Sequence, residues 1–262
     1  MSEATPILDF FRRGEVARDV RLLAAQGMLA PRANEQLEIL VLLLEDADPD
    51  IRQVADATLN SIPVETLQAF LARSDVSIGL REFFGDRGVF PAQIPTIEVD
   101  MDAPLVDKAG SEYLEDEAHP EADRASVQQR IGQMTFTERL KAAMKGTREM
   151  RAILIRDPNK MISAAVLSSP KVTESEAAGF ARMASLSDEI LRAIGHNRVW
   201  MKSYGVVLGL ARNPKTPVAM SLNLLPRLQD RDVQAISVDR NVPEPLRIAA
   251  RKKVVASISG KG

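Results

Sequence analysis

Residues 210–220, LARNPKTPVAM, place an Asn-Pro-Lys step between two apolar stretches, and residues 166–176, VLSSPKVTESE, place a Ser-Pro-Lys step in the same setting 44 residues earlier. Proline and asparagine commonly mark the boundary between two regular elements. At this offset Pro170 aligns with Pro214, and the apolar positions on either side keep their order. A boundary that recurs in this way indicates an internal repeat.

Outward from these two boundaries, three short stretches with helical spacing of apolar residues occur in a fixed order three times. The nine stretches are TFTERLKAAMK, TREMRAILIR and NKMISAAVLSS, then TESEAAGFARM, SDEILRAIG and VWMKSYGVVLGLA, then PVAMSLNLLPRL, DVQAISV and EPLRIAARKKVV. A period of about 40 to 47 residues with two or three helices is the size of HEAT and armadillo repeats. The pattern predicts nine helices over residues 133–257, stacked as an α-solenoid.

Residues typical of helix N-termini stand at the predicted boundaries. A threonine or asparagine followed three residues later by glutamate has capping-box spacing, and a hydroxyl residue before a first-turn proline is a second such signal. The predicted caps are Thr135 with Glu138, Thr173 with Glu176, Asn241 with Glu244, and Thr216 before Pro217.

The N-terminal part predicts further helices. Residues 5–28 have helical spacing that ends at Gly27, and residues 34–59 read as two helices joined at Asp48 and Pro49, an αα-hairpin. The hairpin resembles a HEAT or armadillo unit in its inter-helix turn and second helix, through Asp46, Asp50, Arg52, Val54, Ala55 and Leu59. Two more helices are expected over residues 63–73 and 76–84.

Composition favours an all-α protein, because apolar residues make up 45% of the chain and aromatic residues only 4%. Without cysteine, the chain has no disulfides, thiolate zinc sites or thiol nucleophile. The longest apolar runs, residues 39–44 and 206–211, are too short to cross a bilayer, and the first residues do not resemble a leader peptide. We therefore expect a cytoplasmic protein with no membrane partner.

Charge is unevenly distributed along the chain. Residues 1–97 carry a net charge of −6, residues 98–132 carry −7, and residues 133–262 carry +11. The middle stretch is rich in Pro, Gly, Ser and carboxylates, which predicts a disordered linker. The expected organisation is a smaller N-terminal helical HEAT-like domain (1–90), an acidic disordered linker (91–132), a three-repeat solenoid (133–257) and a frayed tail (258–262).

The C-terminal half also resembles an uncharacterised bacterial family of degenerate HEAT/armadillo-like proteins. The likeness rests on REMRAILIRDPNKMISAAVL, SDEILRAIGHNRVW and DRNVPEPLRIAARK. It implies an α-solenoid fold with no established activity.

Catalytic patterns are lacking in the sequence. There is no Gly-rich phosphate loop after a strand, no H-E-x-x-H and no G-x-S-x-G. The two histidines, His119 in the acidic linker and His196 at a helix end, stand alone. We expect no enzyme, no cofactor, no metal site and no small-molecule substrate.

The best candidate surface is the set of turns between the second and third helices of each repeat, because equivalent turns of a solenoid line up along one edge. Trp200 is either a core residue or an anchor for a partner, and the sequence leaves both readings open. The candidate partner-binding residues are Asn197, Arg198, Trp200, Lys202, Tyr204, Arg212, Lys215, Arg240 and Asn241.

Two functions are compatible with these patterns. The first is a scaffold or adaptor whose repeats bind an acidic or extended protein segment, regulated by its own acidic linker docking near Arg198, Lys202 and Arg240. The alternative is a nucleic-acid-binding protein that uses the basic C-terminal half to contact phosphates.

Overall fold

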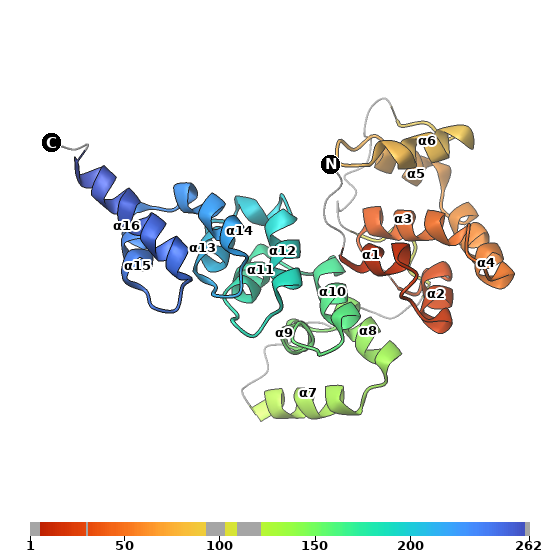
Figure 1. The fold of residues 1–262 in the computed structure, drawn as a ribbon. Coiled ribbons are helices and arrows are strands. Elements are labelled where there is room, and N and C mark those ends of the chain that lie inside the picture. Colours follow the sequence, from red (N-terminus) through yellow and green to blue (C-terminus); the bar gives the residue numbers. More distant parts are fainter. Residues whose placement is uncertain (1–5, 30, 93–102, 109–121, 260–262) are drawn as a thin grey trace. The chain divides into compact units, whose positions relative to one another are not determined.

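The structure, a computed structural model, describes residues 6–29, 31–92, 103–108 and 122–259 (Figure 1). Within these ranges every regular element is a helix, which confirms the predicted all-α class. The chain divides into two compact units, unit 1 (Met1–Lys171) and unit 2 (Val172–Gly262). Among the described helices, none has the length and apolar character needed to cross a membrane.

Unit 1 begins with six helices that match the predicted positions except for one break. They are α1 (Pro6–Arg12), α2 (Arg18–Ala25), α3 (Ala33–Leu43), α4 (Pro49–Asn60), α5 (Val64–Leu71) and α6 (Ile78–Asp86). The expected helical stretch over residues 5–28 is two helices, because the chain turns at Gly14, whose φ of 69° lies in the left-handed region that favours glycine. Gly27, with φ 70°, ends α2 as predicted.

The predicted hairpin junction is confirmed. The Asp48 side chain accepts a hydrogen bond from the Asp50 N–H at 3.0 Å, and Pro49 is the first residue of α4. Arg21 pairs with Asp46 at 3.1 Å, which ties α2 to the turn between α3 and α4. These three helices contact one another and bury Val20, Leu37, Leu40 and Ile51.

The second part of unit 1 contains α7 (Ala122–Gln133), α8 (Phe136–Lys145), α9 (Arg148–Leu154) and α10 (Lys160–Ser168). Helix α7 lies inside the predicted disordered linker. Its alanine, arginine and glutamine residues have high helix propensity, and the buried Ile131 helps to anchor the helix, which contacts α9. Local propensity together with one apolar anchor therefore outweighs the polar composition of this stretch.

The boundary between the compact units differs from the predicted one. Sequence placed the division in residues 91–132, whereas α10 packs against α1 inside unit 1. The Arg32 N–H donates to the Ser168 carbonyl at 3.2 Å, and the Ser168 hydroxyl donates to the buried Glu35 at 3.0 Å. Every residue of α10 after Lys160 is buried, and a helix that is buried all round needs neighbours on several sides.

Unit 2 contains six α-helices and two short 3-10 helices in its described residues, near the positions predicted from the repeats. They are α11 (Glu174–Ala181), α12 (Asp188–His196), η1 (Trp200–Lys202), α13 (Tyr204–Arg212), α14 (Val218–Leu224), η2 (Leu225–Arg227), α15 (Asp230–Val238) and α16 (Glu244–Ser259). Two predicted helices, residues 199–211 and 217–228, are each divided into an α-helix and a 3-10 helix. Helix α13 packs on α11, and α15 packs on α16 (Figure 1). The first of these contacts is close, since a Cβ added at Gly209 would lie 3.0 Å from the Ala181 Cβ.

Two of the predicted capping boxes are confirmed and two predicted caps are wrong: Thr216, and Asn241 with Glu244, since α16 begins only at Glu244. Thr135 with Glu138 starts α8, and Thr173 with Glu176 starts α11, each with both reciprocal hydrogen bonds. Thr216 does not cap α14: the cap residue is Pro217, and no side-chain hydrogen bond caps this helix. Thr216 therefore stands one residue before the cap position, where its oxygen is too early to reach the first free amides.

The α8 capping box predicts a pH dependence. The Glu138 carboxylate accepts from the Thr135 N–H at 2.7 Å, and this bond and that from the Thr135 hydroxyl hold the Glu138 pKa below its ordinary value. Because the folded pKa is lower than the unfolded one, the stabilisation is present above about pH 4.5 and is lost as pH falls through the folded pKa.

We expect hydrogen-exchange protection of the first turn of α8 to fall below about pH 4.5. The Glu138→Gln variant keeps a side-chain acceptor without the titrating group, so its protection should change less. Protection that is constant from about pH 6 to about pH 3 in the unmodified chain would disprove this role of Glu138.

Candidate functional site

The most specific polar site in the described residues is in unit 1, where the short stretch 103–108, APLVDK, lies against the helices. We call this stretch the 103–108 segment. Its main chain is held by one side chain, the amide of Gln36 on α3. The Leu105 and Val106 N–H groups both donate to Gln36 Oε1, at 2.7 and 3.0 Å, and Gln36 Nε2 donates to the Val106 carbonyl. One glutamine thus satisfies three consecutive main-chain groups.

This contact explains why the segment has no regular structure of its own. Two successive N–H groups can reach one oxygen only where the main chain bends, and the chain bends at Leu105. Gln36 is itself 2% exposed, so an unpaired amide there would carry a desolvation penalty. The segment and the Gln36 amide therefore satisfy each other's hydrogen-bonding groups.

The Val106 side chain packs directly against Gly27. A Cβ added at Gly27 would lie only 2.8 Å from Val106 Cγ1, closer than such atoms approach in proteins. Val106 is 9% exposed in this position. Gly27 therefore serves two purposes, since it ends α2 with a positive φ and leaves room for an apolar side chain of the segment.

Charged and polar groups fix the end of the segment. Asp107 pairs with Lys145, the last residue of α8, whose side chain is 8% exposed. The Lys108 N–H donates to the Gly27 carbonyl at 3.2 Å, and Lys108 Nζ donates to the Thr58 hydroxyl on α4 at 3.3 Å. We call Gly27, Gln36, Thr58 and Lys145 the segment site.

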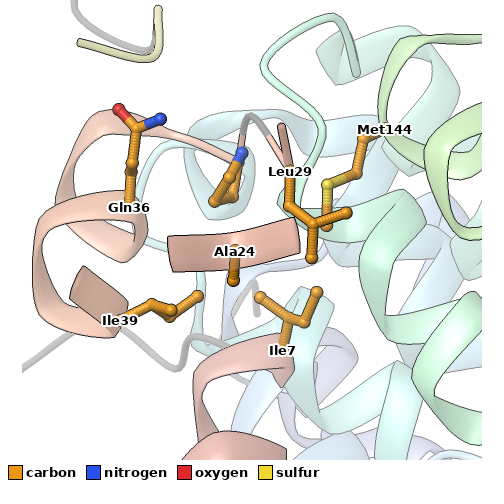
Figure 2. Close-up of a pocket in the computed structure, with 7 residues that line it drawn as sticks. Ile7, Ala24, Leu29, Gln36, Ile39 and Met144 are labelled. Carbon is orange, nitrogen blue, oxygen red and sulfur yellow. The ribbon is translucent and has the colours of Figure 1, made fainter. Parts of the chain in front are cut away.

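A small apolar cavity lies beside the segment site. It is lined by residues of α1, α2, α3 and α8 and of the connection between α2 and α3, and its volume is about 10 Å³. Figure 2 shows the Gln36 amide pointing away from the apolar side chains of Ile7, Ala24 and Ile39. The cavity is about large enough for one water molecule, so it does not accommodate a metabolite. The polar end of Gln36 is thus left for the segment.

The segment site recognises main chain first and side chains second. Three of its hydrogen bonds through Gln36 go to peptide groups, which every residue except proline offers. The Val106 contact and the Asp107 pair add selectivity for one apolar residue followed by one carboxylate. In the part of the chain that the structure describes, His, Asp and Glu side chains form no group of three that could hold a metal ion.

The predicted partner-binding residues all lie in unit 2, and the structure places them in different environments. Trp200 is 3% exposed, so it is a core residue rather than a surface anchor. Asn197 is also buried, and its Oδ1 accepts from the Val199 and Trp200 N–H groups at 3.0 Å each, which fixes the turn after α12.

Two further predicted residues hold unit 2 together. The Tyr204 hydroxyl donates to Asp232 and accepts from the Gln229 N–H at 3.1 Å; its pKa is raised above the ordinary value by burial and by the bond to Asp232. Arg212 pairs with Asp239 at 3.2 Å. The Asp239 pKa is lowered, mainly by the hydrogen bond from the Asn241 N–H and also by Arg212.

The remaining candidates are exposed, Lys202 at the end of η1 and the others on turns: Arg198, Lys215, Arg240 and Asn241. The 103–108 segment, which belongs to the predicted linker, contacts unit 1 at Gln36 and Lys145. The acidic residues 109–121, with His119 among them, lie outside the described residues. His196 is exposed at the end of α12, and its ring nitrogen lies 2.6 Å from the Arg192 carbonyl.

Sequence reasoning missed all four residues of the segment site. One available signal was Gln36 itself, a polar residue within the apolar pattern of α3, and a second was the apolar pair Leu105-Val106 inside the acidic stretch. Neither signal predicts that Gln36 contacts Leu105 and Val106, because these residues lie about 70 positions from Gln36 in the sequence.

Comparison of the chain with family models, with curated proteins and with solved structures finds no match. The resemblance to a HEAT/armadillo-like bacterial family therefore stays a prediction, and the function rests on the chemistry of the segment site.

Proposed function

We propose that this protein is a non-enzymatic, cytoplasmic scaffold or adaptor whose helices bind a short segment of a protein partner. The observation that carries the proposal is the use of Gln36, a buried side-chain amide, to hold three main-chain groups of the 103–108 segment. Main-chain recognition by a preformed side chain suits a partner presented as an unfolded stretch. The helices of residues 133–257, in this proposal, are degenerate HEAT-like repeats that supply further binding surface.

The test uses the full-length chain with its own segment weakened by Leu105→Gly, Val106→Gly and Asp107→Ser, which we call the emptied chain. The probe is a fluorescent peptide of residues 101–110, MDAPLVDKAG. We expect saturable binding in fluorescence anisotropy, and at least roughly tenfold weaker binding when Gln36→Ala is added, because a buried hydrogen-bonded contact is removed. An emptied chain that keeps its helical circular-dichroism spectrum and does not bind the peptide would overturn the proposal.

A nucleic-acid function is the second candidate, and the exposed cations of unit 2 favour it. Arg198, Lys202, Lys215 and Arg240 are exposed, and residues 172–262 carry 14 Lys and Arg against 8 Asp and Glu. If these groups contact phosphates, affinity for a generic duplex should fall roughly tenfold or more between 50 and 200 mM salt. A chain that binds no duplex at 50 mM salt is not a nucleic-acid-binding protein of this kind.

A further inference from the structure

We infer that the 103–108 segment is a built-in competitor for the segment site, and that its sequence describes the partner segment that displaces it. This inference rests on the proposed function. The partner is a protein segment that bends, offers N–H groups at two successive residues, and has a small apolar residue followed by a carboxylate. In the chain itself these two successive residues are Leu105 and Val106, and the carboxylate is Asp107.

The requirement for two N–H groups follows from Gln36. Its Oε1 accepts from both Leu105 and Val106, so proline at either position would remove one donor and leave part of a buried acceptor unsatisfied. Pro104, one residue earlier, lies outside this pair and is tolerated. The site therefore accepts proline before the recognised pair and rejects it within the pair.

The requirement for a small apolar residue follows from Gly27. The Val106 side chain occupies the space that a Cβ at Gly27 would fill, and it is buried there. The requirement for a carboxylate follows from Lys145, whose ammonium group is largely removed from water beside Asp107. A buried cation gains most from a charged partner, because screening by solvent is weak there.

Competition follows from the covalent connection. A segment tethered to its own site is present at a high local concentration, so even weak contacts keep it bound and raise the apparent dissociation constant of an outside ligand. The free energy of displacement is then the difference between two similar sets of contacts. A partner that adds contacts beyond residues 103–108 would win that competition.

The experiment measures the affinity of the 101–110 peptide and its variants for the unmodified and the emptied chain by fluorescence anisotropy. We expect the emptied chain to bind the peptide at least about tenfold more tightly than the unmodified chain. Peptides with Leu105→Pro or Val106→Pro should bind roughly tenfold or more weakly, and Asp107→Asn should weaken binding and reduce its dependence on salt. A Pro104→Ala peptide is the control, because Pro104 lies outside the recognised pair, and it should bind as the parent does.

Each other outcome has a defined meaning. If the emptied chain binds all peptides equally, including the proline variants, Gln36 does not select for two successive N–H groups. The inference is then wrong, while the proposed binding of a protein segment is supported. If the unmodified chain binds as tightly as the emptied one, the segment is no competitor. If no peptide binds a folded emptied chain, the proposed function itself fails. If light scattering shows a dimer that dissociates on emptying, the occupant is a second copy of this chain and the inference of a foreign partner is wrong.

Discussion

The Gln36→Ala variant is expected to release the 103–108 segment while leaving the helices folded. The substitution removes three hydrogen bonds, and at about 0.5 to 1.5 kcal/mol each the bound state should lose roughly 2 to 4 kcal/mol. Amide exchange at Leu105 and Val106 should accelerate by about 30- to 1,000-fold, limited by the rate of an unstructured peptide. Hydrogen exchange followed by mass spectrometry measures this change.

Two variants on the same helix separate the role of Gln36 from general damage to α3. Asn34→Ala removes a hydrogen bond to Asp75 at 3.3 Å and should leave exchange at the segment unchanged. Gln36→Glu keeps the acceptor for two N–H groups but replaces the donor to the Val106 carbonyl with a second oxygen, so it should give an intermediate release. Equal effects of Gln36→Ala and Asn34→Ala would show that the segment responds to the helix and not to the amide.

The second large effect is expected at Gly27. Gly27→Ala introduces two costs: a non-glycine residue at a φ of 70°, about 1 to 2 kcal/mol, and a Cβ 2.8 Å from Val106 Cγ1. The first cost lowers the stability of the turn after α2, and the second expels the segment. We expect a loss of thermal stability together with loss of exchange protection at Leu105 and Val106.

Gly14 supplies the matched control. Its φ is 69° and a Cβ added there has no neighbour within 4 Å, so Gly14→Ala carries the backbone cost alone. It should lower stability by a similar amount and leave the segment protected. Val106→Ala in the Gly27→Ala chain removes the clashing Cγ1 and should restore part of the protection, as a double-mutant cycle would measure. Segment release by Gly14→Ala would mean that protection reports global stability only.

Much of the fold follows from local patterns, and the C-terminal helices show why. Their boundaries are marked by capping residues such as Thr135 and Thr173, whose hydrogen bonds run to amides three residues away. Signals of that range are contained in the sequence itself. The failure at Thr216 concerns a shift of one residue, since proline occupies the cap position instead.

The division into units could not be read from the sequence, because it depends on contacts between distant residues. The linker composition suggested a boundary near residues 91–132, but α10 joins unit 1 through Ser168, which bonds to Glu35. The pairing of these two residues spans 133 positions. No local sequence pattern predicts such a pair, because the sequence does not indicate which hydroxyl group donates a hydrogen bond to Glu35.

The sequence does not reveal the segment site for a related reason, and the partner-binding role of the unit 2 residues stays a prediction. Polar and charged residues at helix ends suggest a binding surface in a sequence, yet Arg212 pairs with Asp239 and Asn197 fixes its own turn, so both make contacts within unit 2. Gln36 is a polar residue within an apolar helix pattern and Gly27 is an ordinary helix end, and neither indicates in the sequence which residues it contacts. Their role exists only where the 103–108 segment meets them.

The most direct test of segment exchange is hydrogen exchange at Leu105 and Val106 in the unmodified full-length chain, with and without saturating 101–110 peptide. We predict that both amides are protected in the chain alone, and that this protection is lost when the unlabelled peptide occupies the segment site. Exchange at the rate of an unstructured peptide in the chain alone, or protection that stays unchanged while the peptide is bound, would contradict the account.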